Sequence, residues 1–142
     1  MHLASEAETR LAAANLAKTL KAGDVVALQG ELGAGKSVFA RALMRALGVK
    51  DEAMPSPTFT LIQTYEGKGC KIAHMDWYRL ESLEDIELLG VREYFQPPWI
   101  CLIEWPERTE SLIPAAAIRV QLECVADDPD ARLLQLAGVS DR

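Results

Sequence analysis

The residues with the clearest chemistry are residues 30–37, whose sequence GELGAGKS fits the phosphate-binding pattern G-x-x-x-x-G-K-[ST]. Glycines in such a loop let backbone N–H groups approach a phosphate closely, because glycine has no Cβ atom and tolerates positive φ. Lys36 supplies a mobile positive charge for the β and γ phosphates, and the Ser37 hydroxyl is placed to bind Mg²⁺. A glycine-rich turn that matches by accident is the alternative. The motif therefore predicts a nucleotide site.

Two carboxylates at the ends of predicted strands are candidates for hydrolytic chemistry. Asp76 lies between His74 and Arg79, in a segment that also holds two aromatic residues. Its carboxylate is able to orient an attacking water or a water bound to Mg²⁺. Glu104 ends an apolar run, and in proteins with this loop a neighbouring parallel strand delivers an acid to the Mg²⁺ side of the phosphates. The alternatives are a core role for His74, a turn or capping role for Asp76, and a solvent-facing charge at Glu104.

Three further polar residues are candidates on weaker grounds. Thr58 lies in the loop 53–60, which two prolines stiffen. A stiff loop after the phosphate-binding helix is where nucleotide switches place a hydroxyl toward Mg²⁺ and the γ-phosphate, although a plain rigid connection is the alternative. Thr9 lies in the first turn of a predicted helix and Arg132 in a predicted hairpin. On the residues alone, both are expected to face solvent.

The elements that must position these residues follow from periodicity and from turn residues. A capping box at Ser5–Glu8 predicts a helix over 6–21, and an apolar run predicts a buried strand over 25–29. The remaining expectations are a helix over 36–47, a hairpin of strands 59–65 and 71–76, a capped helix from 82, a short helix over 91–95, a strand over 99–104, a strand over 117–124, a turn at 127–130 and a strand over 132–136. Together they predict a three-layer α/β fold, with a mainly parallel sheet, helices on both faces and antiparallel edge strands.

Length and charge limit the class of protein. A chain of 142 residues is long enough for one domain with a single core. A net charge of −6 disfavours a free-standing nucleic-acid binder, since affinity for a phosphate backbone comes from clustered Lys and Arg. The three cysteines are widely spaced and odd in number, which favours reduced thiols in the cytoplasm. Neither a signal peptide nor a membrane-spanning run is visible, so we expect a cytoplasmic protein without a membrane partner.

Four segments in this order resemble one family. They are GELGAGKS at 30–37, PSPTF at 55–59, HMDWYRL at 74–80 and LIEWP at 102–106. The set is similar to the TsaE family of P-loop ATPases, from about Thr9 to Arg132. The resemblance implies an ATPase that works with the TsaB and TsaD proteins in forming N6-threonylcarbamoyladenosine at position 37 of tRNA. It further implies that this protein acts on tRNA only indirectly, through the complex.

The resemblance also implies roles for individual residues. ATP is the implied nucleotide and Mg²⁺ the implied metal, bound by Ser37 and Glu104. Asp76, Glu104 and Lys36 would form the hydrolytic site, and Thr58 would lie in a switch-like loop. The residues implied to bind or lie near the nucleotide are Thr9, Gly33, Ala34, Gly35, Lys36, Ser37 and Arg132. Two positions depart from the family, which usually has Thr at position 37 and an aliphatic residue at position 77.

Two other functions fit a phosphate-binding loop. A small-molecule kinase needs an acceptor pocket and usually an arginine-bearing lid, and the region 109–116 is too short and too poor in arginine to supply one. A non-catalytic module that binds partners in a nucleotide-dependent way is the other alternative, and a turnover assay of Asp76→Ala and Glu104→Ala would separate it from an enzyme. The preferred expectation is therefore a slow Mg²⁺-dependent ATPase.

Overall fold

The computed structural model describes residues 1–31, 33–50, 62–78, 84, 87 and 90–138. Thr58 and the rest of the 55–59 motif lie outside the described residues. So do Arg79 and Leu80, the start of the strand expected from 59, and most of the helix expected from 82.

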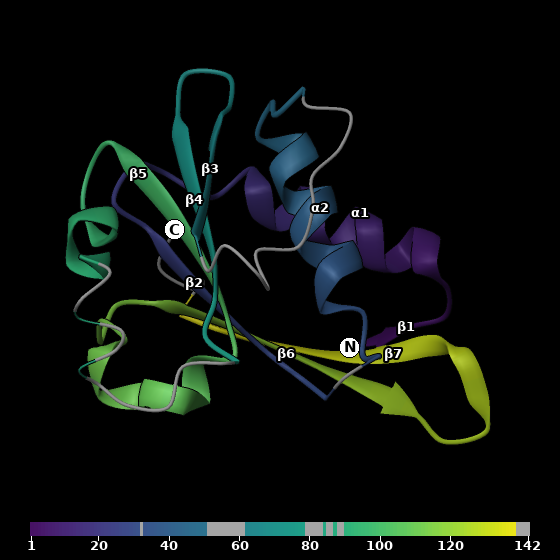
Figure 1. Cartoon of the computed structure of the whole chain (residues 1–142). Coiled ribbons are helices and arrows are strands. Elements are labelled where there is room, and N and C mark those ends of the chain that lie inside the picture. The colour runs from purple at the N-terminus through teal and green to yellow at the C-terminus, as the bar shows by residue number, and fades with distance from the viewer. Residues whose placement is uncertain (32, 51–61, 79–83, 85–86, 88–89, 139–142) are drawn as a thin grey trace.

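One sheet of seven strands organises the chain (Figure 1), in the order β1-β7-β6-β2-β5-β4-β3. The four central strands, β6, β2, β5 and β4, run parallel, while β1, β7 and β3 pair antiparallel at the two edges. Their bounds are β1 His2–Leu3, β2 Val25–Gln29, β3 Ile62–Glu66, β4 Lys71–Asp76, β5 Trp99–Glu104, β6 Ile118–Val125 and β7 Asp128–Ala137. The expected mainly parallel sheet with antiparallel edge strands is confirmed.

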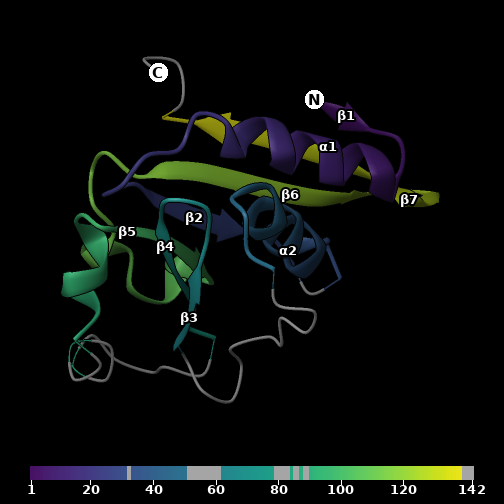
Figure 2. The ribbon, with the colours of Figure 1, turned by 90° about the horizontal axis from the view of Figure 1, so that it is seen from above.

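The central strands are apolar because both of their faces are covered. Val26 and Leu28 of β2 pack with the helices α1 (Glu6–Ala17) and α2 (Lys36–Ala46) on one face. Val25 and Ala27 face the other side, where the short 3₁₀ helices η1 (Val91–Phe95) and η2 (Pro106–Leu112) cover the sheet. Figures 1 and 2 show η1 and η2 well away from α1 and α2. The expected helices on both faces are present, those of the second face as short 3₁₀ turns.

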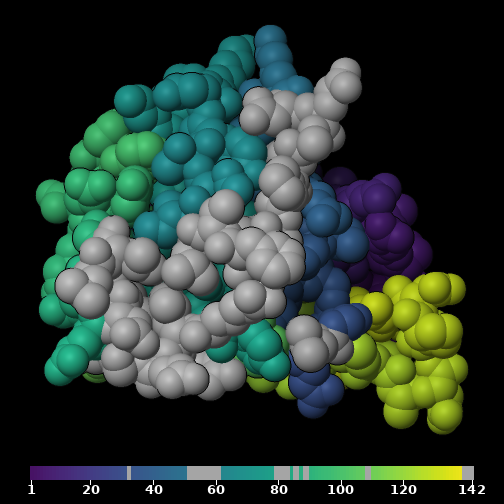
Figure 3. Space-filling view, in the orientation of Figure 1, coloured from purple at the N-terminus to yellow at the C-terminus, as the bar shows by residue number. Residues whose placement is uncertain are grey.

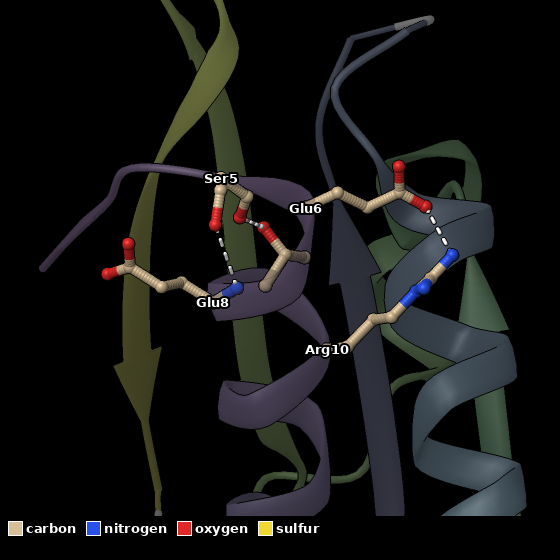
Figure 4. A network of polar contacts seen from close by, with 5 residues as sticks. Ser5, Glu6, Glu8 and Arg10 are labelled. Carbon is tan, nitrogen blue, oxygen red and sulfur yellow. Dashed lines mark hydrogen bonds and ion pairs between the residues drawn. The ribbon is translucent and has the colours of Figure 1, made fainter.

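The first helix starts as predicted but ends early. Ser5 caps it, since the Ser5 Oγ accepts a hydrogen bond from the Glu8 backbone N–H at 3.3 Å (Figure 4). The predicted end at residue 21 is wrong, because α1 ends at Ala17. Thr19 donates both its backbone N–H and its hydroxyl to the Leu16 carbonyl, so this oxygen closes a tighter turn in place of continuing the helix.

The last hairpin is tighter than predicted. A turn at 127–130 is wrong, because β7 begins at Asp128 and Val125 pairs with Asp128. Asp127 takes a positive φ of 67°, a conformation that Asp tolerates better than most residues and that allows a two-residue turn. The hairpin consequently extends β6 and β7 past the end of β2, beside the phosphate-binding loop.

Candidate nucleotide site

The loop between β2 and α2 has the backbone that a phosphate cradle requires. Gly33 and Gly35 have φ values of 84° and 95°, in the left-handed region that favours glycine. Ala34 is fully buried, and α2 begins at Lys36 directly after Gly35. The half-buried Ser37 therefore lies in the first turn of α2, where free backbone N–H groups and the helix dipole favour an anion.

Gly30 has a steric role that differs from that of the other loop glycines. A Cβ atom at this position would lie 2.6 Å from the Leu122 carbonyl oxygen in β6. We expect Gly30→Ala to destabilise the fold by more than about 2 kcal/mol, because a strand backbone cannot easily move away. Gly69→Ala is the comparison, since Gly69 has open space around its Cβ position although, unlike Gly30, it has a positive φ of 73° that alanine disfavours. Urea unfolding compares them, and equal losses would contradict the steric assignment.

Lys36 carries a buried ammonium group without a hydrogen-bond partner. Its side chain is only 6% exposed, and no acceptor among the described residues reaches its Nζ. The Nζ lies 3.4 Å from the centroid of the Trp105 ring, a cation–π contact. Burial lowers the pKa of Lys36, while the negative charges of Glu104, Glu107 and Asp76 oppose this shift. Among the described residues the ammonium therefore interacts with carboxylates only at longer range, and its hydrogen-bonding capacity is available to a bound anion.

The two predicted carboxylates lie side by side at the carboxyl edge of the sheet. Asp76 ends β4 and Glu104 ends β5, and the two residues occupy paired positions of these parallel strands. Both are buried, and both act electrostatically on Lys36. The Tyr78 backbone N–H donates to Asp76 Oδ1 at 2.9 Å, which fixes the Asp76 side chain in a turn. The expected convergence of Lys36, Asp76 and Glu104 is present in the structure.

His74 contacts Glu104 directly. The His74 Nε2 lies 2.7 Å from Glu104 Oε2, and both side chains are buried. An ionised carboxylate has no proton to give, so Nε2–H is the donor and Glu104 the acceptor. The contact holds one oxygen of Glu104 and leaves the other for a further ligand. His74 is therefore neither a plain core histidine nor a surface residue, because it positions a site carboxylate.

Arg132 binds the loop backbone. Its Nε donates to the Ala34 carbonyl at 3.0 Å, and one terminal nitrogen donates to the Gly33 carbonyl at 3.1 Å. The other terminal nitrogen donates to the carbonyls of Pro129 and Ala131 in its own hairpin. Arg132 is therefore not a free surface charge. It fastens the β6–β7 hairpin to the loop through the Gly33 and Ala34 carbonyls.

We expect Arg132→Lys to weaken ATP binding about tenfold although the charge is kept, because one ammonium cannot replace a planar fork that reaches four carbonyls. Isothermal titration with ATP measures the change. Arg92→Lys is the control, since Arg92 forms an exposed ion pair with Glu87 far from the loop. Unchanged ATP affinity in Arg132→Lys would show that charge alone, rather than the fork, is what the site needs.

Thr9 lies closer to the loop than the sequence alone suggested. It is buried, and it lines a cavity of about 100 Å³ together with Gly35, Val38 and Arg132. These residues place the cavity between α1, the start of α2 and β7. Figure 3 shows the yellow atoms of the C-terminal part of the chain below the purple N-terminal atoms. The expectation that Thr9 faces solvent is wrong. The structure brings Thr9 and Arg132 to the loop.

Trp105 is the site residue that the sequence reasoning missed. It follows Glu104 and has a φ of 61°, which is uncommon for a bulky residue. That conformation turns its ring onto the Lys36 ammonium and against the Tyr78 ring, whose centroid lies 4.8 Å away. No local pattern marks this backbone strain; the only sequence signal was the LIEW segment itself.

The residues present fit ATP with Mg²⁺. The loop provides a glycine cradle, Lys36 an unpartnered cation, and Ser37 with Glu104 and Asp76 the oxygen donors that Mg²⁺ prefers. Within the described ranges, no cluster of three or more His, Cys, Asp or Glu side chains could hold a metal alone. Mg²⁺ sites that depend on substrate phosphates need only one or two protein carboxylates. The described helices include none long and apolar enough to cross a membrane.

Comparison with known proteins identifies the family. The family model described as "Threonylcarbamoyl adenosine biosynthesis protein TsaE" matches residues 3–133. The TsaE protein of Treponema pallidum is 43% identical over 110 residues, which cover 78% of this chain and 80% of that protein. The TsaE protein of Rickettsia conorii is 42% identical over 137 residues, covering 96% of this chain and 77% of that protein.

A solved structure agrees with these relatives. The crystal structure of Bacillus subtilis YdiB matches with a TM-score of 0.82 and 30% identity, covering 100% of this chain and 86% of that chain. The family match spans the loop, both strand-end carboxylates, Thr9 and Arg132, so the site and the family coincide along the sequence. The chain therefore belongs to the TsaE family, whose members have a role in tRNA threonylcarbamoyladenosine biosynthesis.

Proposed function

We propose that this protein is a Mg²⁺-dependent ATPase of the cytoplasm that supports the TsaB–TsaD pair in forming N6-threonylcarbamoyladenosine at position 37 of tRNA. The observation that carries the ATPase assignment is the buried, unpartnered Lys36 ammonium between the glycine loop and two strand-end carboxylates. Leaving such a group buried costs free energy, unless an anion binds there. The pathway assignment is supported by membership of the TsaE family.

Each residue has a distinct task in this proposal. The loop N–H groups and Lys36 bind the β and γ phosphates, and Thr9 and Arg132 shape the cavity beside Gly35. Ser37 and Glu104 would hold Mg²⁺, whose charge would neutralise that of the phosphates when the metal is bound. Asp76 would align the attacking water and accept its proton, because His74 holds one oxygen of Glu104 and the other would bind Mg²⁺. Positioning and charge neutralisation supply the catalysis, so a slow basal rate is expected.

Reconstitution tests the proposal. Purified TsaB, TsaD and unmodified tRNA are combined with ATP and the substrates of threonylcarbamoyl transfer, with and without this protein, and modified nucleoside is counted per TsaD by mass spectrometry. We expect repeated turnover with the wild type, and roughly single turnover without it or with Lys36→Ala. A non-hydrolysable ATP analogue separates hydrolysis from binding. Repeated turnover with the analogue would support a non-catalytic module and contradict the ATPase.

A further inference from the structure

A groove of about 600 Å³ opens beside the first residues of the phosphate-binding loop. Its walls are the loop backbone at Gly30 and Glu31, the end of β6 from Gln121 to Cys124, and the Tyr78–Trp105 ring pair. Glu107, in the first turn of η2, also lines it. The groove lies apart from the Thr9 cavity, on the side of the loop where the site proper is bounded by Trp105.

The described lining of the groove is negatively charged, and the cation known to act on it is Lys36, which lies against the Trp105 ring and interacts electrostatically with Glu107. Glu31, Glu107 and Glu123 line it, all three exposed, and its described lining includes no Lys or Arg. None of the three carboxylates forms an ion pair within the described part of the chain; Glu123 accepts only from the neutral Gln121 amide, at 3.0 Å. Charges so arranged favour a cation and repel a nucleic acid.

The aromatic pair narrows the kind of cation. Tyr78 is 40% exposed, and its ring lies 4.8 Å from that of Trp105 at a 49° tilt. Trp105 already contacts one cation, the Lys36 ammonium. Guanidinium groups stack on such rings while their N–H groups bond carboxylates, whereas an ammonium is a point charge that does not stack. Rings beside carboxylates thus fit arginine better than lysine.

We propose that this groove receives an arginine-bearing segment of a protein partner. The identity of the partner as the TsaB–TsaD pair rests on the proposed function; the arginine chemistry rests on the groove. The nucleotide site itself has a shortage of cations among the described residues, since Lys36 is its one buried cation and Arg132 is fully engaged with carbonyls. A partner arginine beside Gly30 brings positive charge to the start of the loop.

Occupation of the groove is coupled to the nucleotide through Trp105. The Trp105 ring is a wall of the groove and at the same time contacts the Lys36 ammonium. A segment that stacks on Tyr78 and Trp105 therefore favours one orientation of the Trp105 ring. That orientation in turn favours one position of the Lys36 ammonium. Linkage requires the reverse effect to be equal, so ATP changes the affinity for the arginine segment by the factor by which that segment changes the affinity for ATP.

The test compares two double variants of the full chain. Glu107→Gln with Glu123→Gln removes two groove charges, and Glu8→Gln with Glu66→Gln removes two exposed charges elsewhere. Binding to the TsaB–TsaD pair is measured with ATP at two salt concentrations. We expect the groove variant to bind about tenfold more weakly and with less salt dependence, and the control to stay within about twofold of the wild type.

A peptide probe keeps the groove testable without the pair. A blocked tri-arginine peptide is titrated into isotope-labelled protein, with its citrulline counterpart as a neutral isostere, and amide shifts are followed by NMR. We expect the arginine peptide alone to shift Gly30, Glu31 and the Trp105 indole, and the groove variant to abolish these shifts. If the wild type does not bind the TsaB–TsaD pair, the proposed function fails. The peptide titration then still tests whether the groove binds arginine. Equal pair binding by both double variants, or arginine shifts spread outside the groove, would overturn the proposal.

Discussion

Replacing Lys36 with methionine is expected to raise the thermal stability of the nucleotide-free protein while weakening ATP binding at least about 100-fold. The Lys36 ammonium is buried without a hydrogen-bond partner among the described residues, and methionine fills similar space without a charge. An unsatisfied buried polar group costs about 1–3 kcal/mol, and the Trp105 contact offsets part of this. We therefore expect a gain of about 3 °C in melting temperature.

The pH dependence of this gain follows from the lowered pKa of Lys36. In the unfolded chain Lys36 titrates at its ordinary value of 10.5, whereas burial lowers its pKa in the folded protein. Below both values, each state carries the proton and the folded state bears the full cost of the buried charge. Between them, the unfolded state binds more protons, so the wild type gains stability as pH rises. The advantage of Lys36→Met should accordingly shrink as pH approaches 10.5 from neutrality.

Thermal melts in metal-free buffer check both points, and adding ATP with Mg²⁺ should reverse the order of the two proteins. The wild type is stabilised by a ligand that binds only the folded state, whereas Lys36→Met is not. Lys21→Met is the control, because Lys21 is exposed and precedes β2 at the opposite end of that strand. A wild type more stable than Lys36→Met without nucleotide would show that the ammonium is already satisfied in the free protein.

The part of the site that lies on strand ends was predictable from sequence, and the part made by long-range packing was not. Asp76 and Glu104 each end an apolar run, and parallel strands bring such ends to the same edge of a sheet. The contacts of Arg132 with the Gly33 and Ala34 carbonyls join residues about a hundred positions apart, and no periodicity reports them. They arise because Asp127 closes the β6–β7 hairpin in two residues.

The role of Trp105 was missed and the end of α1 was predicted wrongly because specific local contacts, which residue propensities do not record, decide both. Trp105 takes a left-handed φ that its residue type disfavours, so the surrounding contacts with Lys36 and Tyr78 outweigh the intrinsic preference. Thr19 competes for the Leu16 carbonyl with both its N–H and its hydroxyl, although the apolar pattern continues to Leu20. The pattern of apolar and polar residues indicates which side chains are buried. In both places, however, a specific polar or aromatic contact determines the backbone conformation.

Glu104→Gln is expected to lower ATP hydrolysis at least about 100-fold while changing ATP affinity much less. Glutamine keeps the shape, and its carbonyl oxygen still accepts the His74 Nε2–H bond, so the end of β5 is preserved. What is lost is the negative charge that faces Lys36 and that would bind Mg²⁺. Phosphate release at saturating ATP and Mg²⁺ measures the rate, and titration with ATP measures the affinity.

The two carboxylates are distinguished by their different anchors. Asp76→Asn keeps the bond from the Tyr78 N–H, so a comparable loss of rate would indicate that Asp76 aligns the water while Glu104 serves the metal. Raising the Mg²⁺ concentration should then partly restore the hydrolysis rate of Glu104→Gln but not that of Asp76→Asn, because only the former loses metal affinity.

Asp24→Asn is the control variant. Asp24 is a buried carboxylate before β2 that accepts a hydrogen bond from the Lys21 backbone N–H, away from the loop. This substitution should lower stability without lowering the rate per folded molecule. Full phosphate release by both Glu104→Gln and Asp76→Asn would contradict the hydrolytic assignment and favour a module that only binds ATP.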